Sequence, residues 1–195
     1  VEGVDLSEDM GNAVFSEIQK ALHENLVIFF RDQNLTPDDQ KKLGRRFGTL
    51  NIHPQYVPLD GHPEILPVLK APDETNNIGD VWPTDVNFLE QPSMGSLLYA
   101  HEVPTAGGDT MFANQYLAYE TLSDGMKKLL NNVAAVHSDR VLSNPAKAAD
   151  RNEGRSTRIR ENAMTEEEIT NEHPVARPHV ELSPIHHRSS RPQHG

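Results

Sequence analysis

The first part of the chain carries two helical patterns separated by a short apolar run. Ser7 stands before two acidic residues in the form of a helix N-cap, and apolar residues then recur at helical spacing up to about Asn25. Residues 26–30 are rich in β-branched and aromatic side chains and predict a strand buried on both faces. Thr36, followed by a proline and two acids, predicts a second helix that stops at Gly48, because Thr accepts a backbone N–H and acids favour the positive helix end.

The middle of the chain is patterned as loops and β-structure. Residues 50–72 are rich in Pro, Gly and His and predict a long, structured loop system with one strand at 65–69. Residues 95–103 and 110–113 have the composition of strands, and a turn with two glycines lies between them. This arrangement predicts a β-hairpin.

The last third of the chain begins with short elements and then loses its apolar pattern. Residues 115–132 predict two short helices, the second capped by Ser123, and residues 133–136 predict another strand. Residues 143–172 are polar and charge-rich, which is the composition of a surface excursion or a lid rather than of core. Residues 181–195 contain little that can pack, so we expect a disordered tail.

Composition and charge exclude several classes of site. The length of 195 residues and the hydrophobic fraction of 36% indicate one globular domain with a buried core. The formal charge of -11 repels phosphate backbones, so nucleic acid is not an expected partner. The chain has no cysteine, which excludes disulfides and thiolate metal ligands, and any metal must be held by His, Asp or Glu.

Membrane association is not expected either. The longest purely apolar stretch, residues 26–30, is far too short to span a bilayer, and the chain starts without a charged and then apolar leader. We therefore expect a cytoplasmic protein without a membrane partner, and a homo-oligomer remains open.

The most specific motif is the segment DVWPTDVNF at residues 80–88, followed by Gly-Gly-Asp-Thr at residues 107–110. Two earlier segments belong to the same series, namely FFRDQ at residues 29–33 and the Phe-Gly and His-Pro pairs within residues 47–54. In collinear order over about residues 2–177, this series resembles the taurine dioxygenase (TauD/TfdA) family of Fe(II)/2-oxoglutarate-dependent dioxygenases.

The resemblance implies roles for individual residues. Members of this family have Trp-His-Thr-Asp at the motif, and its His and Asp are two of three facial iron ligands on one face of a strand. By this correspondence Asp85 is the metal ligand, and Thr110 contacts 2-oxoglutarate. His53 and Tyr56 correspond to residues that contact substrate. Position 83 is proline, which has no side-chain lone pair, so only the aspartate of the local ligand pair is present.

The resemblance also implies a fold and a reaction. The expected fold is mainly β with flanking helices (α+β), a cupin-like double-stranded β-helix or jelly roll that is incomplete because the domain at residues 1–180 looks C-terminally truncated. The expected reaction uses Fe(II), 2-oxoglutarate and O2 to hydroxylate a small anionic sulfonate, sulfate ester or carboxylate, releasing succinate and CO2. Asp85 and Thr110 are then expected to face a common barrel cavity.

Other interpretations remain open. One is a catalytically inactive truncated homologue that acts as a ligand-binding or interaction module, because Pro83 replaces a ligand. Another is an interaction module that binds a partner through residues 143–172. Taken alone, Asp85 would be a surface or capping carboxylate and His53 a hydrogen-bonded loop histidine. The single tryptophan, Trp82, is expected to be a packing residue.

Overall fold

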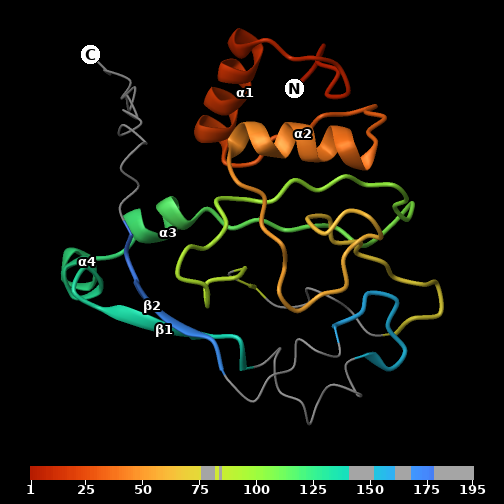
Figure 1. The fold of residues 1–195 in the computed structure, drawn as a ribbon. Helices are drawn as coiled ribbons and strands as arrows, with labels where there is room; N and C mark the ends of the chain where they lie inside the picture. The colour runs from red at the N-terminus through yellow and green to blue at the C-terminus, as the bar shows by residue number, and fades with distance from the viewer. Residues whose placement is uncertain (76–81, 84, 141–151, 161–167, 178–195) are drawn as a thin grey trace.

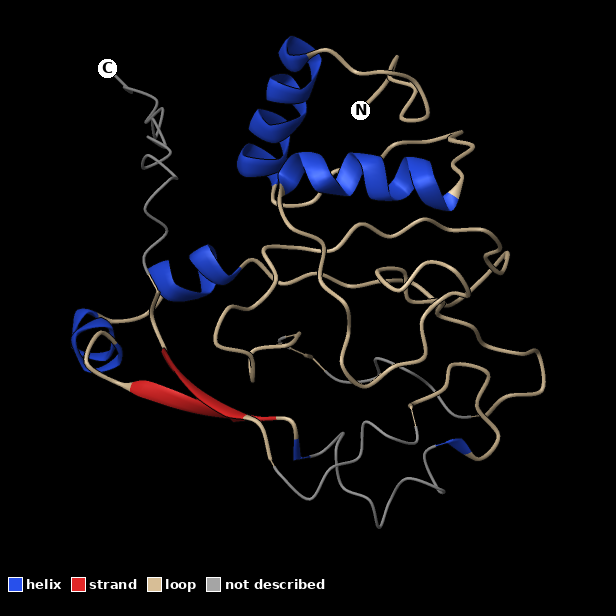
Figure 2. Ribbon diagram, viewed as in Figure 1, coloured by secondary structure: helices blue, strands red, loops and turns tan. Residues whose placement is uncertain are grey.

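A computed structural model describes residues 1–75, 82–83, 85–140, 152–160 and 168–177. Its elements are, in chain order, α1 (Asn12–Asn25), α2 (Pro37–Phe47), α3 (Gln115–Glu120), α4 (Asp124–Leu130), β1 (Ala134–Ser138) and β2 (Thr170–Pro174). Figure 1 shows α1 and α2 together at one end, and β1 and β2 side by side near α3 and α4. Loops fill the space between these two groups (Figure 2).

Helix α1 ends at Asn25 as predicted, but it begins later than the sequence indicates. Its N-cap is Gly11, so the prediction that Ser7 caps the helix is wrong. The backbone N–H and the hydroxyl of Ser7 instead donate to the Asp5 carboxylate, at 2.9 and 2.6 Å. Such a local turn offers the backbone an alternative to the helix, which explains the later start.

The prediction for the second helix is confirmed at both ends. The Thr36 hydroxyl accepts the Asp39 N–H at 3.2 Å, and the Asp39 carboxylate accepts the Thr36 N–H at 3.0 Å. This reciprocal capping box satisfies two donors that the helix itself leaves unpaired. The helix then stops before Gly48, as expected.

The predicted strand at residues 26–30 does not form. Leu26 adopts a left-handed conformation with φ of 65°, and its N–H donates to the Leu22 carbonyl at 2.7 Å, closing α1. Ile28 and Phe30 then pack against the core as an irregular segment. A short apolar run predicts that a segment is buried. It does not predict whether that segment forms a strand or packs irregularly over two helices.

The main hydrophobic core lies around α1 and α2. Its buried members are Leu6, Ile18, Leu35 and Leu43, and the partly buried residues packed on them are Val4, Met10, Ile28, Phe30, Phe47 and Tyr99. Tyr99 joins this core from far along the chain: its hydroxyl donates to the Gln33 carbonyl at 3.1 Å and accepts the Leu35 N–H at 3.3 Å. The segment around Tyr99 is thereby held beneath α2.

The predicted hairpin of residues 95–103 and 110–113, and the predicted strand at 65–69, are also wrong. These residues run in extended or irregular form without a backbone ladder in the described part of the chain (Figure 2). Several large apolar side chains of the hairpin region are exposed, namely Met94, Leu98, Val103, Met111 and Phe112. Composition identifies a segment that can become a strand, whereas a strand forms only where a partner offers N–H and C=O groups.

The elements within residues 115–138 agree better with the sequence. Both short helices form, with Ser123 capping α4, and the predicted strand at 133–136 is found as β1. It pairs antiparallel with β2 in a register that runs from Ala134 opposite Pro174 to Ser138 opposite Thr170. The first residues of β2 fall in the polar 143–172 segment, where no strand was expected.

The 143–172 segment also contributes to the core, contrary to prediction. Its described part includes Thr157 and Ile159, which are only 5% and 4% exposed. The predicted tail at residues 181–195 lies outside the described residues. Helices and an antiparallel sheet are both present, and the jelly roll remains a prediction. None of the described helices has the length and apolar character needed to cross a bilayer.

Candidate functional site

The two residues that the sequence assigns to substrate binding lie together. The rings of His53 and Tyr56 meet edge-on, with 4.8 Å between their centroids. The backbone N–H of Gln55 donates to Nδ1 of His53 at 3.2 Å. Because Nδ1 is the acceptor, the neutral ring carries its proton on Nε2, where it can be donated to a ligand.

Buried polar contacts hold this loop in place. Gln55 is 2% exposed, and its Nε2 donates to Oδ2 of Asp139 at 3.0 Å. Asp139 is 3% exposed, and its Oδ1 accepts the Ile169 N–H at 2.9 Å. The side chain of Gln55 thus ties the loop to the end of β1. Burial makes such a bond stronger and its loss more costly than at the surface.

A second segment, residues 158–160, pairs with the same loop. Ile159 forms an isolated antiparallel bridge with Tyr56, and the Val57 N–H donates to the Arg158 carbonyl at 2.9 Å. Arg160 donates twice, from its backbone N–H to the Gln55 carbonyl at 2.6 Å and from Nε to the Tyr56 carbonyl at 2.7 Å. This pairing places a guanidinium group beside the His53 loop.

The predicted metal ligand, Asp85, directly precedes a turn from Val86 to Leu89 that β2 supports. The turn is closed by the Leu89 N–H, which donates to the Val86 carbonyl at 2.9 Å. Asn171 of β2 donates from Nδ2 to the Phe88 carbonyl at 2.6 Å, and His173 Nε2 lies 3.0 Å from the Leu89 carbonyl oxygen. Two polar side chains of β2 therefore position the backbone that carries Asp85.

Two charged side chains, those of Asp85 and Arg160, affect the pKa of His53. Burial lowers the pKa of His53 below its ordinary value, the Arg160 guanidinium lowers this pKa further, and the Asp85 carboxylate partly offsets both effects. His53 is consequently neutral at neutral pH. The ring contact joins His53 and Tyr56, hydrogen bonds hold Arg160 on the same loop, and the Asp85 carboxylate acts on the imidazole through its charge.

Two other predicted residues, Thr110 and Trp82, make no hydrogen bond to this group within the described residues. Thr110 is exposed and makes no hydrogen bond within the described residues, so its contact with 2-oxoglutarate remains a prediction. Trp82 is 66% exposed, so the expectation that it is a packing residue is wrong. An indole combines a large apolar surface with an N–H donor, so its presence in a motif does not by itself imply burial.

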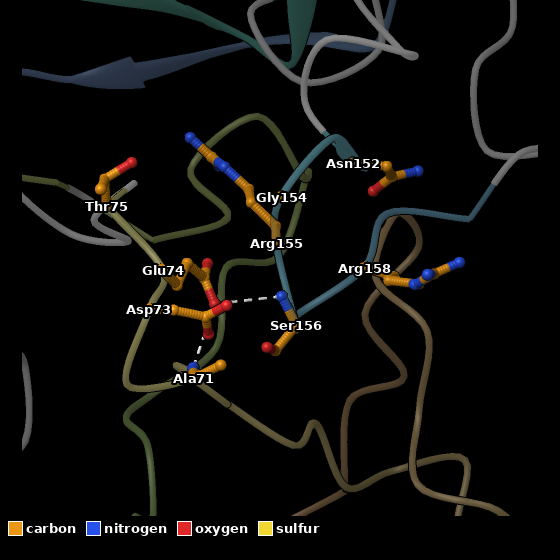
Figure 3. Close-up of a pocket in the computed structure, with 9 residues that line it drawn as sticks. All are labelled: Ala71, Asp73, Glu74, Thr75, Asn152, Gly154, Arg155, Ser156 and Arg158. Atoms are coloured by element: carbon orange, nitrogen blue, oxygen red, sulfur yellow. Dashed lines mark hydrogen bonds between the residues drawn. The ribbon is translucent and has the colours of Figure 1, made fainter.

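A polar cavity of about 360 Å³ lies next to the site, between residues 71–75 and 152–158 (Figure 3). On its wall the Glu74 carboxylate accepts the N–H groups of Ala71 and Ser156, each at 3.2 Å. Burial alone would raise the pKa of Glu74, but these hydrogen bonds outweigh it and hold the pKa below its ordinary value. Glu74 thus fixes the segment that leads to residues 158–160.

A family comparison decides how these residues are to be interpreted. The family described as "Taurine catabolism dioxygenase TauD, TfdA family" has a model that matches residues 1–194. The chain belongs to this family. The TauD/TfdA family has a cupin-like fold, and membership implies Fe(II) together with 2-oxoglutarate (α-ketoglutarate) and O2 as co-substrates.

Individual TauD/TfdA relatives agree with this assignment. The chain is 35% identical over 140 residues to an alpha-ketoglutarate-dependent sulfate ester dioxygenase of Pseudomonas putida, covering 71% of this chain and 46% of the relative. It is 32% identical to an alkylsulfatase of Acinetobacter baylyi (71% of this chain, 43% of the relative). It is 28% identical to an alpha-ketoglutarate-dependent sulfonate dioxygenase of Saccharomyces cerevisiae (93% and 44%). The chain spans less than half the length of these relatives.

The described residues do not form a complete iron site. Among them, no three His, Asp or Glu side chains converge where they could hold a metal ion together. Pro83 stands where the resemblance places an imidazole, and proline offers no lone pair. In the described part, Asp85 is therefore a single carboxylate and the ligand set of a TauD-type centre is incomplete.

Proposed function

We propose that this chain forms the substrate-facing part of an α-ketoglutarate-dependent dioxygenase that acts on a small sulfate ester or sulfonate. The observation that supports the proposal is the edge-on contact between the His53 and Tyr56 rings, together with the charge effect of the Asp85 carboxylate, from a second motif of the TauD/TfdA series, on His53. The names of the relatives support the substrate class, since two of them are a sulfate ester dioxygenase and a sulfonate dioxygenase.

His53 acts as a neutral hydrogen-bond donor to the anionic group of the substrate. Its Nδ1 is occupied by the Gln55 N–H, which leaves the Nε2–H to bind a sulfate or sulfonate oxygen. The Tyr56 ring packs edge-on against the imidazole and limits its rotation. A hydrogen-bond donor that is held in place orients the substrate before the reaction. Binding energy is thereby used to position the reacting carbon.

Asp85 is the carboxylate through which this chain would contact iron, and Thr110 is its contact to 2-oxoglutarate. Iron, when bound in such a site, supplies the oxidising chemistry, while the protein positions the substrate and excludes water. The absence of an imidazole at Pro83 weakens the metal site. We therefore expect Pro83→His to increase iron-dependent activity.

The proposal is tested by succinate formation. The chain and its Pro83→His variant are incubated with Fe(II), 2-oxoglutarate, ascorbate and O2, with hexyl sulfate, hexane-1-sulfonate or taurine as the probe. We expect succinate that depends on one of these anions, more of it from Pro83→His, and none from Asp85→Ala. Asp73→Ala, a change to another acid outside the candidate iron site, is the matched control. Absence of succinate from both the chain and Pro83→His with every probe would contradict the proposal.

A further inference from the structure

Arg160 is a cation beside the candidate site that no motif of the sequence series identifies. Its backbone N–H and its Nε bond to the carbonyls of Gln55 and Tyr56, at 2.6 and 2.7 Å. These two bonds place the start and the middle of the side chain against the loop that carries His53. The guanidinium is therefore anchored close to the imidazole.

Within the described part of the chain, no hydrogen bond engages the two terminal nitrogens of the guanidinium. An arginine side chain has five N–H donors, and the bond to the Tyr56 carbonyl uses only the one at Nε. Within the described ranges, no carboxylate lies within ion-pair distance of Arg160. The four N–H groups of the two terminal nitrogens form a planar fork, which matches two oxygens of a sulfate, sulfonate or carboxylate.

The charge balance of the region calls for such a cation. The chain as a whole carries a formal charge of -11, which repels an anionic ligand. The Asp85 carboxylate, which acts on His53, is negatively charged. A sulfate group that binds beside His53 therefore needs a positively charged side chain near it. Arg160 is partly buried, which strengthens its attraction for an anion relative to an arginine exposed to water.

We propose that Arg160 binds the anionic group of the substrate, its terminal nitrogens gripping two sulfate or sulfonate oxygens while the Nε2–H of His53 donates to a third. This assignment rests on the proposed function, because it takes the substrate to be a sulfate ester or sulfonate. Arg160 and His53 then form a two-sided anion clamp on the 53–57 loop.

The neighbouring Arg158 provides a matched control. It lies two residues away in the same segment and is exposed, and only its carbonyl contacts the loop, through the Val57 N–H. In Figure 3 its side chain points away from Glu74 and lines the separate cavity. Loss of its charge changes the net charge of the protein as much as loss of the Arg160 charge does, but leaves the clamp intact.

The test measures binding without iron or turnover. Hexyl sulfate, hexane-1-sulfonate and hexan-1-ol are titrated calorimetrically into the full chain and into Arg160→Gln, Arg160→Lys and Arg158→Gln, and the His53 ring signals are followed by NMR. We expect Arg160→Gln to weaken binding of both anions by about 10- to 100-fold. Arg160→Lys should give a smaller loss, while Arg158→Gln and the affinity for hexan-1-ol should be unchanged.

Several results would overturn the assignment. They are anion binding by Arg160→Gln that equals that of the unmodified chain, an equal loss in Arg158→Gln, or anions that bind the unmodified chain no more tightly than hexan-1-ol. If Arg160→Gln does not fold, as judged by circular dichroism, Arg160→Lys is the deciding variant. Full anion affinity in Arg160→Lys would contradict the contact between the planar guanidinium and two substrate oxygens. Arg160-dependent binding without succinate formation would contradict the proposed function alone, whereas succinate formation with an unchanged KM in Arg160→Gln would contradict the clamp alone.

Discussion

The helix pair α1–α2 and the His53 loop are held together by different forces. Around the helices the buried groups are apolar side chains, such as Ile18 and Leu43. Around the loop the buried groups include the polar side chains of Gln55 and Asp139, which are almost completely buried. Apolar burial has no preferred direction, so it stabilises a region without fixing one side chain. Hydrogen bonds are directional, and an unpaired buried partner is costly, so the second region fixes orientation.

The largest expected effect on stability comes from a substitution in the apolar core around α1 and α2. Leu43→Ala removes buried apolar surface and leaves a cavity, so the free energy of unfolding should fall by about 2–5 kcal/mol. Chemical denaturation measures this loss. Val14→Ala in α1, where the side chain is 44% exposed, is the control and should stay within about 0.5 kcal/mol. A loss for Leu43→Ala no larger than the control would contradict the assignment of the core.

The next largest effect comes from a substitution in the polar network around the His53 loop. Asp139→Ala leaves the Gln55 amide without its acceptor, which should cost about 1–3 kcal/mol of unfolding free energy. The His53 ring signals should also shift in NMR spectra, because Gln55 donates to that ring. Asp139→Asn retains an oxygen acceptor and should change both measurements less. Equal effects from the two variants would show that the hydrogen bond to Gln55 does not account for the loss of stability or for the shift of the His53 signals.

A smaller change tests whether the two regions are independent. Thr36→Ala removes the N-cap of α2 and should lower stability by about 1 kcal/mol. Because the side-chain hydrogen bonds of Thr36 in the described residues go to Asp39 within the cap, the NMR signals of His53 should not move. Thr49→Ala, an exposed threonine outside the helix, serves as the control. Movement of the His53 signals in Thr36→Ala alone would indicate that the regions are coupled.

The smallest expected effect concerns the charge of His53. Its folded-state pKa is below the unfolded value of 6.5, so its contribution to stability is complete above pH 6.5 and is lost as the pH falls through the folded-state value. Arg160→Gln should raise the His53 pKa and Asp85→Asn should lower it further. An NMR titration of the ring measures both, with Arg158→Gln as the control. Shifts in the opposite directions would contradict the placement of the two charges.

Local signals in the sequence predicted the helices well and the strands poorly. The capping box at Thr36 and the cap at Ser123 lie within a few residues of the helices they start, so they can be read without knowing the rest of the fold. The strands at 26–30, 65–69 and 95–103 depended on partners elsewhere in the chain. Strand β2 was missed at its start because its partner, β1, and not its own composition, makes it a strand.

The same division holds for the candidate site. The motifs by themselves indicated the family, and the resemblance they carry gave His53, Tyr56, Asp85 and Thr110 as predicted site residues. Only the tertiary structure revealed Gln55, Asp139 and Arg160, whose sequence surroundings are ordinary. Gln55 and Asp139 are 84 residues apart, and Arg160 is 104 residues from Tyr56. A contact between groups so far apart in the chain is decided by how the chain folds back on itself, and no local pattern encodes it.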